Sequence, residues 1–509
     1  MFRLWVRQLI VIFVLSACLF SIGAYAQVAP VGPLPTQKQK QWQEMELVFF
    51  AHFGVNTFTD REWGDGSEDP TVFNPSQFDA GQWARAVKAA GGKLIILTCK
   101  HHDGFCLWPS AYTEHSVKNS PWKNGQGDVV AEVAAACEEY GLKFGVYLSP
   151  WDRNHPDYGD SPVYNQYFLN QLTELLTNYG PIAEVWFDGA NGEGPNGKRQ
   201  VYDFQAYYSL IRRLQPNAVI AIMGPDVRWV GNESGVAAET EWSVRVSTPQ
   251  ALNDPKIQFN ESLVAGDVAH LQDAGKNRDD IAFNHLADGA AQGQAPLIWY
   301  PAETDVSIRP GWFYHASQDD QVKSMGRLVD IFYQSIGRNT VLLLNIPPDQ
   351  RGLFHENDVW RLMQFGAYIK DTFSQNLIRS NSYSYLANTH QGDYGPNKLF
   401  DGNHDTFWAP KEVLANSPLE INLHDPLTFD VVMLQEPIGM GQRIAAFHVE
   451  AKVDEKWKLL AEGTTIGYKR LLRVEETTSD ALRITIQQSR GLPLLSEFGL
   501  YKQAEYETE

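Results

Sequence analysis

Cysteine is scarce in this chain, with only four in 509 residues. Cys18 lies near the N-terminus, and Cys99, Cys106 and Cys137 follow within the first third of the sequence. A disulfide-stabilised scaffold needs a denser and even set of cysteines, so the sequence excludes that class. The spacing of Cys99 and Cys106 does not establish a bridge, and we expect buried free thiols.

Basic residues are outnumbered, because 42 lysines and arginines stand against 61 aspartates and glutamates. The resulting formal net charge of −19 repels phosphate backbones, so we expect no nucleic-acid partner. Hydrophobic residues make up 43% of the chain, enough to bury a core. The 15 tryptophans favour a carbohydrate ligand, since flat aromatic faces stack on sugar rings, although we expect most of them in the core.

Long apolar runs are missing after the N-terminus, where nothing approaches the ~20 residues of a membrane-spanning helix. Residues 1–26 combine a basic start, an apolar stretch and the small-x-small sequence Ala24-Tyr25-Ala26, which predicts a cleaved signal peptide. The sequence around Cys18 also resembles a lipoprotein box, which would tether the chain through that residue. We therefore expect an exported protein, periplasmic or secreted, without a transmembrane segment.

Strand-like apolar runs alternate with segments of helical period from Leu47 onward, which is typical of a parallel α/β fold. The predicted strands are residues 47–55, 94–98, 144–148, 184–187, 219–223 and 341–346. The predicted helices are residues 79–90, 129–140, 164–179, 204–214, 322–337 and 359–373. These units suffice for a (β/α)8-like barrel over residues 27–376. A doubly wound sheet is the alternative, but no GxGxxG fingerprint follows the first strand.

The pattern changes after Phe373, where short strands with alternating polarity replace the helices. Residues 419–423, 447–450 and 482–486 are the clearest of these strands. Alternation with frequent turns predicts an antiparallel β-sandwich for residues 377–509.

Polar side chains follow several of the predicted barrel strands. They are His52, His101 and His102, Trp151, and Asp188. The carboxyl ends of parallel strands meet at one face of a barrel, so these residues predict a pocket there. Neighbouring side chains point to opposite faces of a strand, so His101 and His102 can share the pocket only if their strand has already ended.

Two other chemistries are disfavoured by their missing motifs. Three histidines and an aspartate could bind zinc, but neither HxH nor HExxH spacing occurs, and no GxSxG elbow is present. We expect no catalytic cofactor. Glycoside hydrolysis instead needs two carboxyl groups. Asp188 suits one role by its position, and Glu233, Glu239 and Glu241 are open alternatives for the other.

Five motifs carry a specific resemblance. They are residues 51–54 (AHFG), 61–66 (REWGDG), 100–105 (KHHDGF), 184–189 (EVWFDG) and 231–235 (GNESG). Together, over about residues 45–373, they resemble the α-L-fucosidases of glycoside hydrolase family 29. The second and fifth motifs are similar to the subfamily that prefers α-1,3/1,4-linked fucose on branched glycans.

The resemblance implies a retaining double displacement, with Asp188 as nucleophile and Glu233 as general acid/base. It implies that the fucose pocket is lined by His52, Glu62, Trp63, His101, His102 and Tyr147. Trp186 could shield the nucleophile, with a place in the barrel core as the equal alternative. Trp312 could add an aromatic surface. Glu303 is a candidate for a further pocket carboxylate, although a surface ion pair is its expected role.

The C-terminal segment resembles a discoidin-type (coagulation-factor type C) sandwich through residues 399–403 (LFDGN) with Thr406 and Trp408. Such modules often bind carbohydrate and hold a structural calcium ion, for which Asp401 and Glu497 are the candidate ligands. We expect fucosylated glycans as partners. The alternatives are a non-catalytic sugar-binding protein and another exo-glycosidase, and the sequence does not predict an oligomeric state.

Overall fold

The computed structural model describes residues 28–246, 297–379, 383–387, 390, 392–411 and 418–506. The predicted signal peptide and Cys18 lie outside these residues. Within the described ranges, no helix is both long and apolar enough to cross a membrane.

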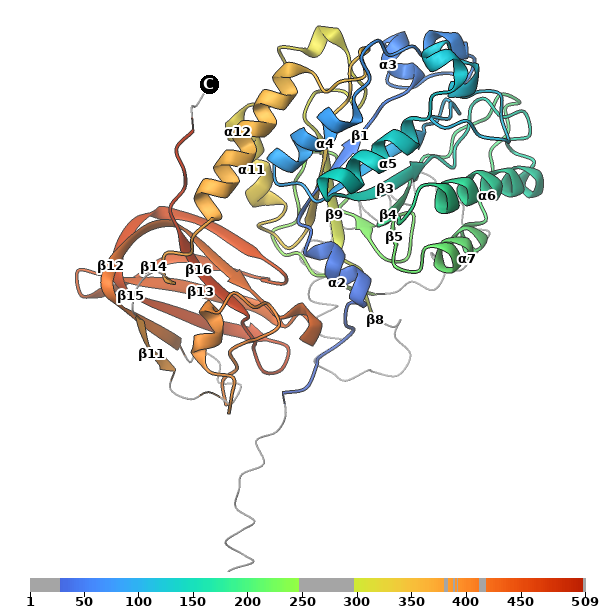
Figure 1. The fold of residues 1–509 in the computed structure, drawn as a ribbon. Helices are drawn as coiled ribbons and strands as arrows, with labels where there is room; N and C mark the ends of the chain where they lie inside the picture. The colour runs from blue at the N-terminus through green and yellow to red at the C-terminus, as the bar shows by residue number, and fades with distance from the viewer. Residues whose placement is uncertain are drawn as a thin grey trace, which may run out of the picture.

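Eight parallel strands form the first domain, which lies at the upper right of Figure 1. Their order is β5-β4-β3-β2-β1-β10-β9-β6. A parallel bridge between Ala221 and Val227 brings the two ends of this order together. The result is a nearly closed barrel, which confirms the predicted (β/α)8-like fold. The strands are β1 (Leu47–Ala51), β2 (Leu94–Lys100), β3 (Lys143–Leu148), β4 (Glu184–Phe187), β5 (Val219–Ile222), β6 (Arg228–Trp229), β9 (Ala302–Ser307) and β10 (Val341–Asn345).

Helices cover the outside of the barrel. They are α4 (Ala80–Ala89), α5 (Val129–Tyr140), α6 (Ser161–Asn178), α7 (Phe204–Leu214), α11 (Met325–Gln334) and α12 (Glu356–Phe373), with the short α2 (Gln37–Gln43) and α3 (Val55–Thr59) near the start of the chain. Asp79, Asp128 and Asp203 cap α4, α5 and α7 by accepting a backbone N–H of the first turn. β5 leads into β6 without a helix, so the barrel is irregular on that side.

Strand alternation divides the apolar side chains between two cores. Phe50 and Trp186 belong to the cluster inside the barrel, whereas their neighbours Phe49 and Phe187 pack under the helices. On β9 the inward positions are polar, because Glu303 and Asp305 alternate with the outward Val306. Because these inward side chains are polar, β9 was not predicted from the hydrophobic pattern of the sequence. β6 was not predicted either, since it has only two residues.

One predicted strand was too long. β1 ends at Ala51 rather than at residue 55, because residues from Val55 onward form α3. His52 is therefore the first residue after β1, at the carboxyl end of this strand.

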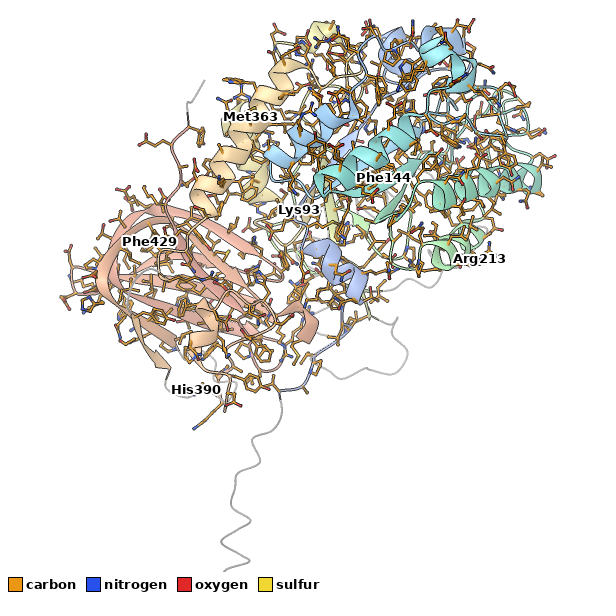
Figure 2. The ribbon with its side chains drawn as sticks, in the orientation of Figure 1. Lys93, Phe144, Arg213, Met363, His390 and Phe429 are labelled. Atoms are coloured by element: carbon orange, nitrogen blue, oxygen red, sulfur yellow. The ribbon has the colours of Figure 1, made fainter. Side chains whose placement is uncertain are left out.

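Antiparallel strands form the second domain. They are β11 (Tyr383–Ala387), β12 (Pro418–Gln435), β13 (Ile444–Val453), β14 (Lys456–Gly463), β15 (Arg470–Ser489) and β16 (Glu497–Tyr501). Their order is β11-β12-β15-β13-β14, with β16 beside β12, and their apolar faces enclose a separate core that includes Phe429 (Figure 2). This arrangement is consistent with the predicted discoidin-like sandwich. A small sheet pairs β7 (Val244–Val246) with β8 (Leu297–Trp299).

The sandwich packs against α11 and α12 of the barrel (Figure 1). The rings of Tyr501 and Phe373 lie 5.1 Å apart, and Arg473 pairs with Asp330 at 2.7 Å. Elsewhere the outer helix surface faces solvent, as the exposed Met363 on α12 shows (Figure 2). The two domains therefore share an apolar contact with an ion pair at its edge.

Candidate active site

A cavity of about 380 Å³ opens at the carboxyl ends of the barrel strands, within the size range of small-ligand sites. All ten residues assigned to catalysis or sugar binding from the sequence line it: His52, Glu62, Trp63, His101, His102, Tyr147, Trp186, Asp188, Glu233 and Trp312. Six different strand ends or following loops thus contribute to one pocket.

Asp188 directly follows β4 and is held by two donors. Its Oδ1 accepts the backbone N–H of Ala190 at 2.7 Å, and its Oδ2 accepts the hydroxyl of Tyr147 at 3.0 Å. Nε2 of His102 lies 3.9 Å from Oδ2. These contacts orient the carboxylate at the cavity wall.

The three pocket histidines are neutral. Burial lowers the pKa of all three, that of His52 to about 4. His52 Nδ1 donates to Asn345 Oδ1 at 2.8 Å, and His102 Nδ1 donates to Ser149 Oγ at 2.7 Å. A neutral ring that donates from Nδ1 keeps Nε2 as an acceptor, so these two rings can accept sugar hydroxyls. β2 ends at Lys100, which lets His101 and His102 reach the same cavity, as the sequence required.

Glu233 lies on the loop after β6, and its carboxylate is exposed at the cavity. Its Oε2 accepts the indole N–H of Trp312 at 3.1 Å. The other two candidates lie elsewhere: Glu239 pairs with Arg338 at 2.7 Å, and Glu241 pairs with Arg245 at 2.8 Å. Of these three carboxylates, Glu233 is thus the one that lines the cavity, and it is also the one that the motif resemblance singles out.

Glu62 holds the loop that carries Trp312. Its carboxylate accepts the backbone N–H groups of Trp312 at 2.9 Å and Phe313 at 3.3 Å, and it contacts His315 Nε2 at 2.7 Å. A side chain at Gly311 would meet Glu62 Oε1. Glu62 thus shapes the pocket through this loop as well as lining it.

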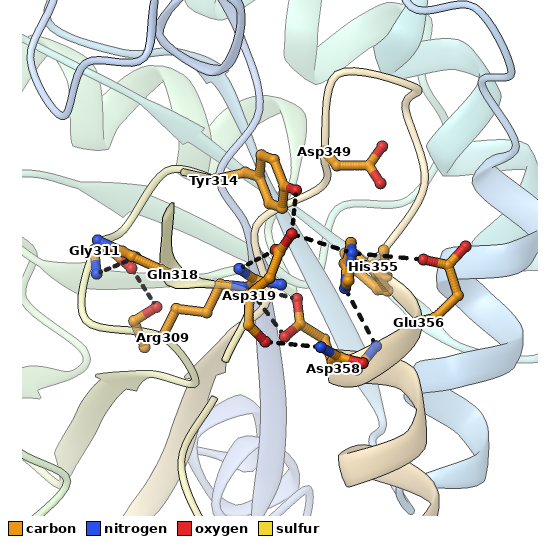
Figure 3. Close-up of polar contacts among 12 residues, drawn as sticks. Arg309, Gly311, Tyr314, Gln318, Asp319, Asp349, His355, Glu356 and Asp358 are labelled. Carbon is orange, nitrogen blue, oxygen red and sulfur yellow. Dashed lines mark hydrogen bonds and ion pairs between the residues drawn. The ribbon is translucent and has the colours of Figure 1, made fainter. Parts of the chain in front are cut away.

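An ion pair also connects the loop that carries Trp312 to α12. The fully buried Arg309 pairs with Asp358 at 2.9 Å and with Asp319 at 2.8 Å (Figure 3). Asp319 also accepts the hydroxyl of Tyr314 at 3.1 Å. A buried charge pair is costly to break, so it keeps the loop in one place.

Aromatic side chains cover both the floor and the mouth of the pocket. Trp186 stacks on Tyr147 with ring centroids 5.3 Å apart, and it belongs to the barrel core as well as to the cavity. At the mouth, Trp63 is 51% exposed and stands edge-on to His102 and Trp151. Trp151 itself packs behind the pocket and does not line it.

Six residues that line the cavity were not predicted from the sequence: Phe50, Gly189, Ala190, Ile222, Trp229 and Asp305. Among them, Trp229 on β6 and Asp305 on β9 bring polar side-chain atoms to the pocket. Trp229 Nε1 donates to Asp305 Oδ1 at 2.7 Å. Burial raises the pKa of Asp305 well above its usual range, and the charge of Glu233 contributes. The polar alternation of residues 303, 305 and 307 was the available signal. The expectation for Glu303 was wrong, because this residue is fully buried inside the barrel.

The predicted calcium ligands lie in the sandwich. Glu497 Oε1 pairs with Arg379 at 2.6 Å, and the Arg379 guanidinium lies against Gly402. Asp401 accepts the hydroxyl of Thr406 at 2.6 Å. No group of three or more His, Cys, Asp or Glu side chains able to hold a metal occurs in the described part of the chain. The second oxygen of this carboxylate, Glu497 Oε2, has no hydrogen-bond partner among the described residues.

Comparison with known proteins decides the family. The profile of the Alpha-L-fucosidase family matches residues 36–372, and that of the F5/8 type C domain matches residues 379–498. The chain belongs to the α-L-fucosidase family. It is therefore a glycoside hydrolase, which sets aside the non-catalytic alternative.

Similar proteins share both domains of this fucosidase. Alpha-L-fucosidase 1 of Arabidopsis thaliana is 44% identical over 479 residues, which cover 93% of this chain and 88% of the relative. A glycoside hydrolase 29 family member from an unknown rumen bacterium is 40% identical with a TM-score of 0.76, over 94% of this chain and 79% of that one. The Ruminococcus gnavus GH29 fucosidase in complex with fucose is 33% identical with a TM-score of 0.79, over 95% and 98%.

Proposed function

We propose that this α-L-fucosidase works by retaining double displacement, with Asp188 as nucleophile and Glu233 as general acid/base. The observation that carries the proposal is the pairing of these two carboxyls in one cavity, Asp188 held by two donors and Glu233 beside the mouth. A retaining pair needs both carboxyl groups within reach of one anomeric carbon.

In the first step an oxygen of Asp188 attacks the anomeric carbon of fucose. The bond to the leaving oxygen breaks, and Glu233 gives its proton to that oxygen. In the second step Glu233 takes a proton from water, whose oxygen attacks the anomeric carbon and releases Asp188. The neutral His52 and His102 accept sugar hydroxyls during both steps, and no cofactor takes part.

The natural substrates are proposed to be glycans with terminal α-1,3- or α-1,4-linked fucose. The resemblance of the REWGDG and GNESG motifs supports this preference. The mouth supports it as well, because Trp63, Trp229 and Trp312 offer aromatic faces beyond a single sugar ring. An exposed tryptophan is suited to stacking on the neighbouring sugar of a branched glycan.

The decisive experiment measures fucose release from α-1,2-, α-1,3- and α-1,4-fucosylated oligosaccharides and from an aryl α-L-fucoside. Glu233→Gln should slow glycan hydrolysis by ~10²–10⁴-fold, as expected for a lost general acid. It should slow cleavage of an aryl fucoside less, since a good leaving group needs little protonation. Asp188→Asn should abolish both reactions. For the wild type, NMR should show α-fucose as the first product, as expected for a retaining enzyme.

Glu239→Gln is the matched control, because Glu239 lies outside the pocket, and it should leave the rates near those of the wild type. An active Asp188→Asn variant, or a β-anomer as first product, would overturn the mechanism. Release from the α-1,2 substrate alone would overturn the linkage preference.

Export and calcium binding stay predictions. The features of residues 1–26 support export, periplasmic or secreted, and N-terminal sequencing of the mature protein would tell cleavage before Gln27 from lipid attachment at Cys18. For calcium at Asp401 and Glu497, the support is the likeness of residues 399–403 to discoidin-type loops. A calcium titration of the whole protein would test it.

A further inference from the structure

Two carboxyl groups face each other inside the barrel, below the pocket. Glu184 begins β4 and Glu303 is the second residue of β9, and both are fully buried. Neither forms a salt bridge with a described basic residue. Two ionised carboxylates in such a place would be very costly, so their protonation must differ from that of surface carboxyls.

Each carboxyl has one oxygen occupied by a tryptophan. Trp42 Nε1 donates to Glu184 Oε2 at 2.8 Å, and Trp186 Nε1 donates to Glu303 Oε1 at 2.7 Å. The remaining oxygens, Glu184 Oε1 and Glu303 Oε2, are buried and receive no N–H or O–H from any third residue that the structure describes.

The two side chains are hydrogen-bonded to each other, which requires a proton on one of them. Burial raises the pKa of both carboxyls, and the charge of Glu184 raises that of Glu303 further, so Glu303 carries the proton. The nearby titratable groups do not supply a cation: Asp226 acts on Glu184 and is itself paired with Lys38 and Arg212, and Asp305 lies two residues beyond Glu303.

A continuous set of contacts leads from this pair to the nucleophile. Trp186 stacks on Tyr147 with an interplanar angle of 24°, and the Tyr147 hydroxyl donates to Asp188 Oδ2 at 3.0 Å. The position of the Trp186 ring is therefore set at one edge by Glu303 and at its face by Tyr147.

We propose that Glu184 and Glu303 share one proton and that this protonated pair positions Trp186 and Tyr147 against Asp188. Both glutamates are positioning residues, since neither lines the cavity. Loss of the shared proton at alkaline pH leaves two facing carboxylates, which repel each other and shift Trp186. The catalytic consequence rests on the proposed role of Asp188.

The number of hydrogen-bond donors and acceptors between residues 184 and 303 differs between single and double glutamine variants, and this difference tests the proposal. In Glu303→Gln, the amide oxygen accepts Trp186 and the amide N–H replaces the shared proton toward Glu184. Glu184→Gln does the same in the opposite direction, with Trp42 as the donor to its oxygen. In the double variant both oxygens serve the tryptophans, so two amide N–H groups face each other without an acceptor.

The experiment measures kcat, KM and the pH profile on an aryl α-L-fucoside for the wild type, both single variants and the double variant. Each single variant should keep kcat within ~3-fold, whereas the double variant should lose ~10-fold or more, the cost of one unmade buried hydrogen bond. The single variants should also lack the alkaline limb that proton loss from the pair gives the wild type.

Equal losses in single and double variants, or an unchanged alkaline limb in the single variants, would overturn the proposal. If the double variant does not fold, the pH profiles of the single variants decide. If the wild type is active but Asp188→Asn is active too, the assigned nucleophile fails instead. The carboxyl pair is then tested by thermal unfolding of the wild type and of Glu303→Gln between pH 5 and pH 8. As the pH rises, the Tm of the wild type should fall relative to the Tm of Glu303→Gln.

Discussion

At the scale of single residues, burial rather than charge pairing sets the chemistry of the sugar pocket. His52, His101 and His102 are held neutral because their charged forms would lose hydration. A neutral imidazole keeps one ring nitrogen as an acceptor for a sugar hydroxyl, whereas an imidazolium can only donate. The pocket therefore binds an uncharged ligand without placing a cation beside Asp188.

This burial predicts a pH-dependent stability. The pKa of His52 is about 4 in the folded protein and ~6.5 in the unfolded chain, so the unfolded chain binds more protons between these values. The free energy of unfolding should thus fall on acidification, by ~1.4 kcal/mol per pH unit for each such histidine. Denaturant titrations from pH 6.5 to 4 should give a shallower slope for His52→Gln than for the wild type.

The exposed His424 of the sandwich provides the matched control, since His424→Gln should leave the wild-type slope unchanged. A His52→Gln slope equal to that of the wild type would contradict the assignment of a buried neutral ring.

At the scale of elements, the loop after β9 brings Trp312 to the cavity through two anchors. Glu62 accepts its backbone N–H groups from the pocket side, and Arg309 fixes it to Asp358 on α12. Because Glu62 Oε1 fills the space beside Gly311, the loop tolerates no larger residue there.

Gly311→Ala should therefore displace Glu62 and release Trp312 from Glu233. We expect kcat/KM on an aryl fucoside to fall by ~10-fold or more, because a charged hydrogen bond contributes about 1.5–3 kcal/mol. Gly326→Ala on α11, where only Tyr506 comes within 4.0 Å of a new methyl group, should retain full activity. Equal activity of the two variants would show that the loop is not held by Glu62.

At the scale of the whole molecule, the sandwich supports the chain that follows Glu233. Thr240 bonds Thr464 at 2.8 Å, and Ser243 donates its backbone N–H to Gln442 at 2.8 Å. Arg470, at 2% exposure, pairs with Glu239 and donates to its carbonyl oxygen. The second domain thus contacts the segment of residues 239–243, which follows Glu233 in the chain.

Arg470→Ala should lower the free energy of unfolding by about 1–3 kcal/mol, because it removes a buried donor from Glu239. It should also split the calorimetric transition, since the barrel and the sandwich lose a shared contact. Lys458→Ala is the control, as it breaks only an exposed pair with Glu475, which contributes ~0–1 kcal/mol. A single unchanged transition in Arg470→Ala would mean that the domains are not coupled there.

The sequence by itself determined the fold class, the order of most elements and ten of the residues that line the pocket. Helices such as Val129–Tyr140 and Phe204–Leu214 were predictable because period, capping aspartate and stop residues are local signals. Most of these pocket residues were predictable because they lie in five short motifs that carry a family resemblance, whereas Tyr147 and Trp312 lie outside the motifs. What remained hidden were the two-residue β6 and the strand β9, whose inward side chains are polar.

Only the tertiary structure decided the surroundings of each carboxyl group. Without the motif resemblance, the sequence left Glu233, Glu239 and Glu241 open. They differ in the structure because folding brings arginines to the last two and Trp312 to the first. The Glu184–Glu303 pair likewise depends on two strands 119 positions apart in the chain. Contacts between distant segments set burial and charge pairing, and a local pattern contains no record of them.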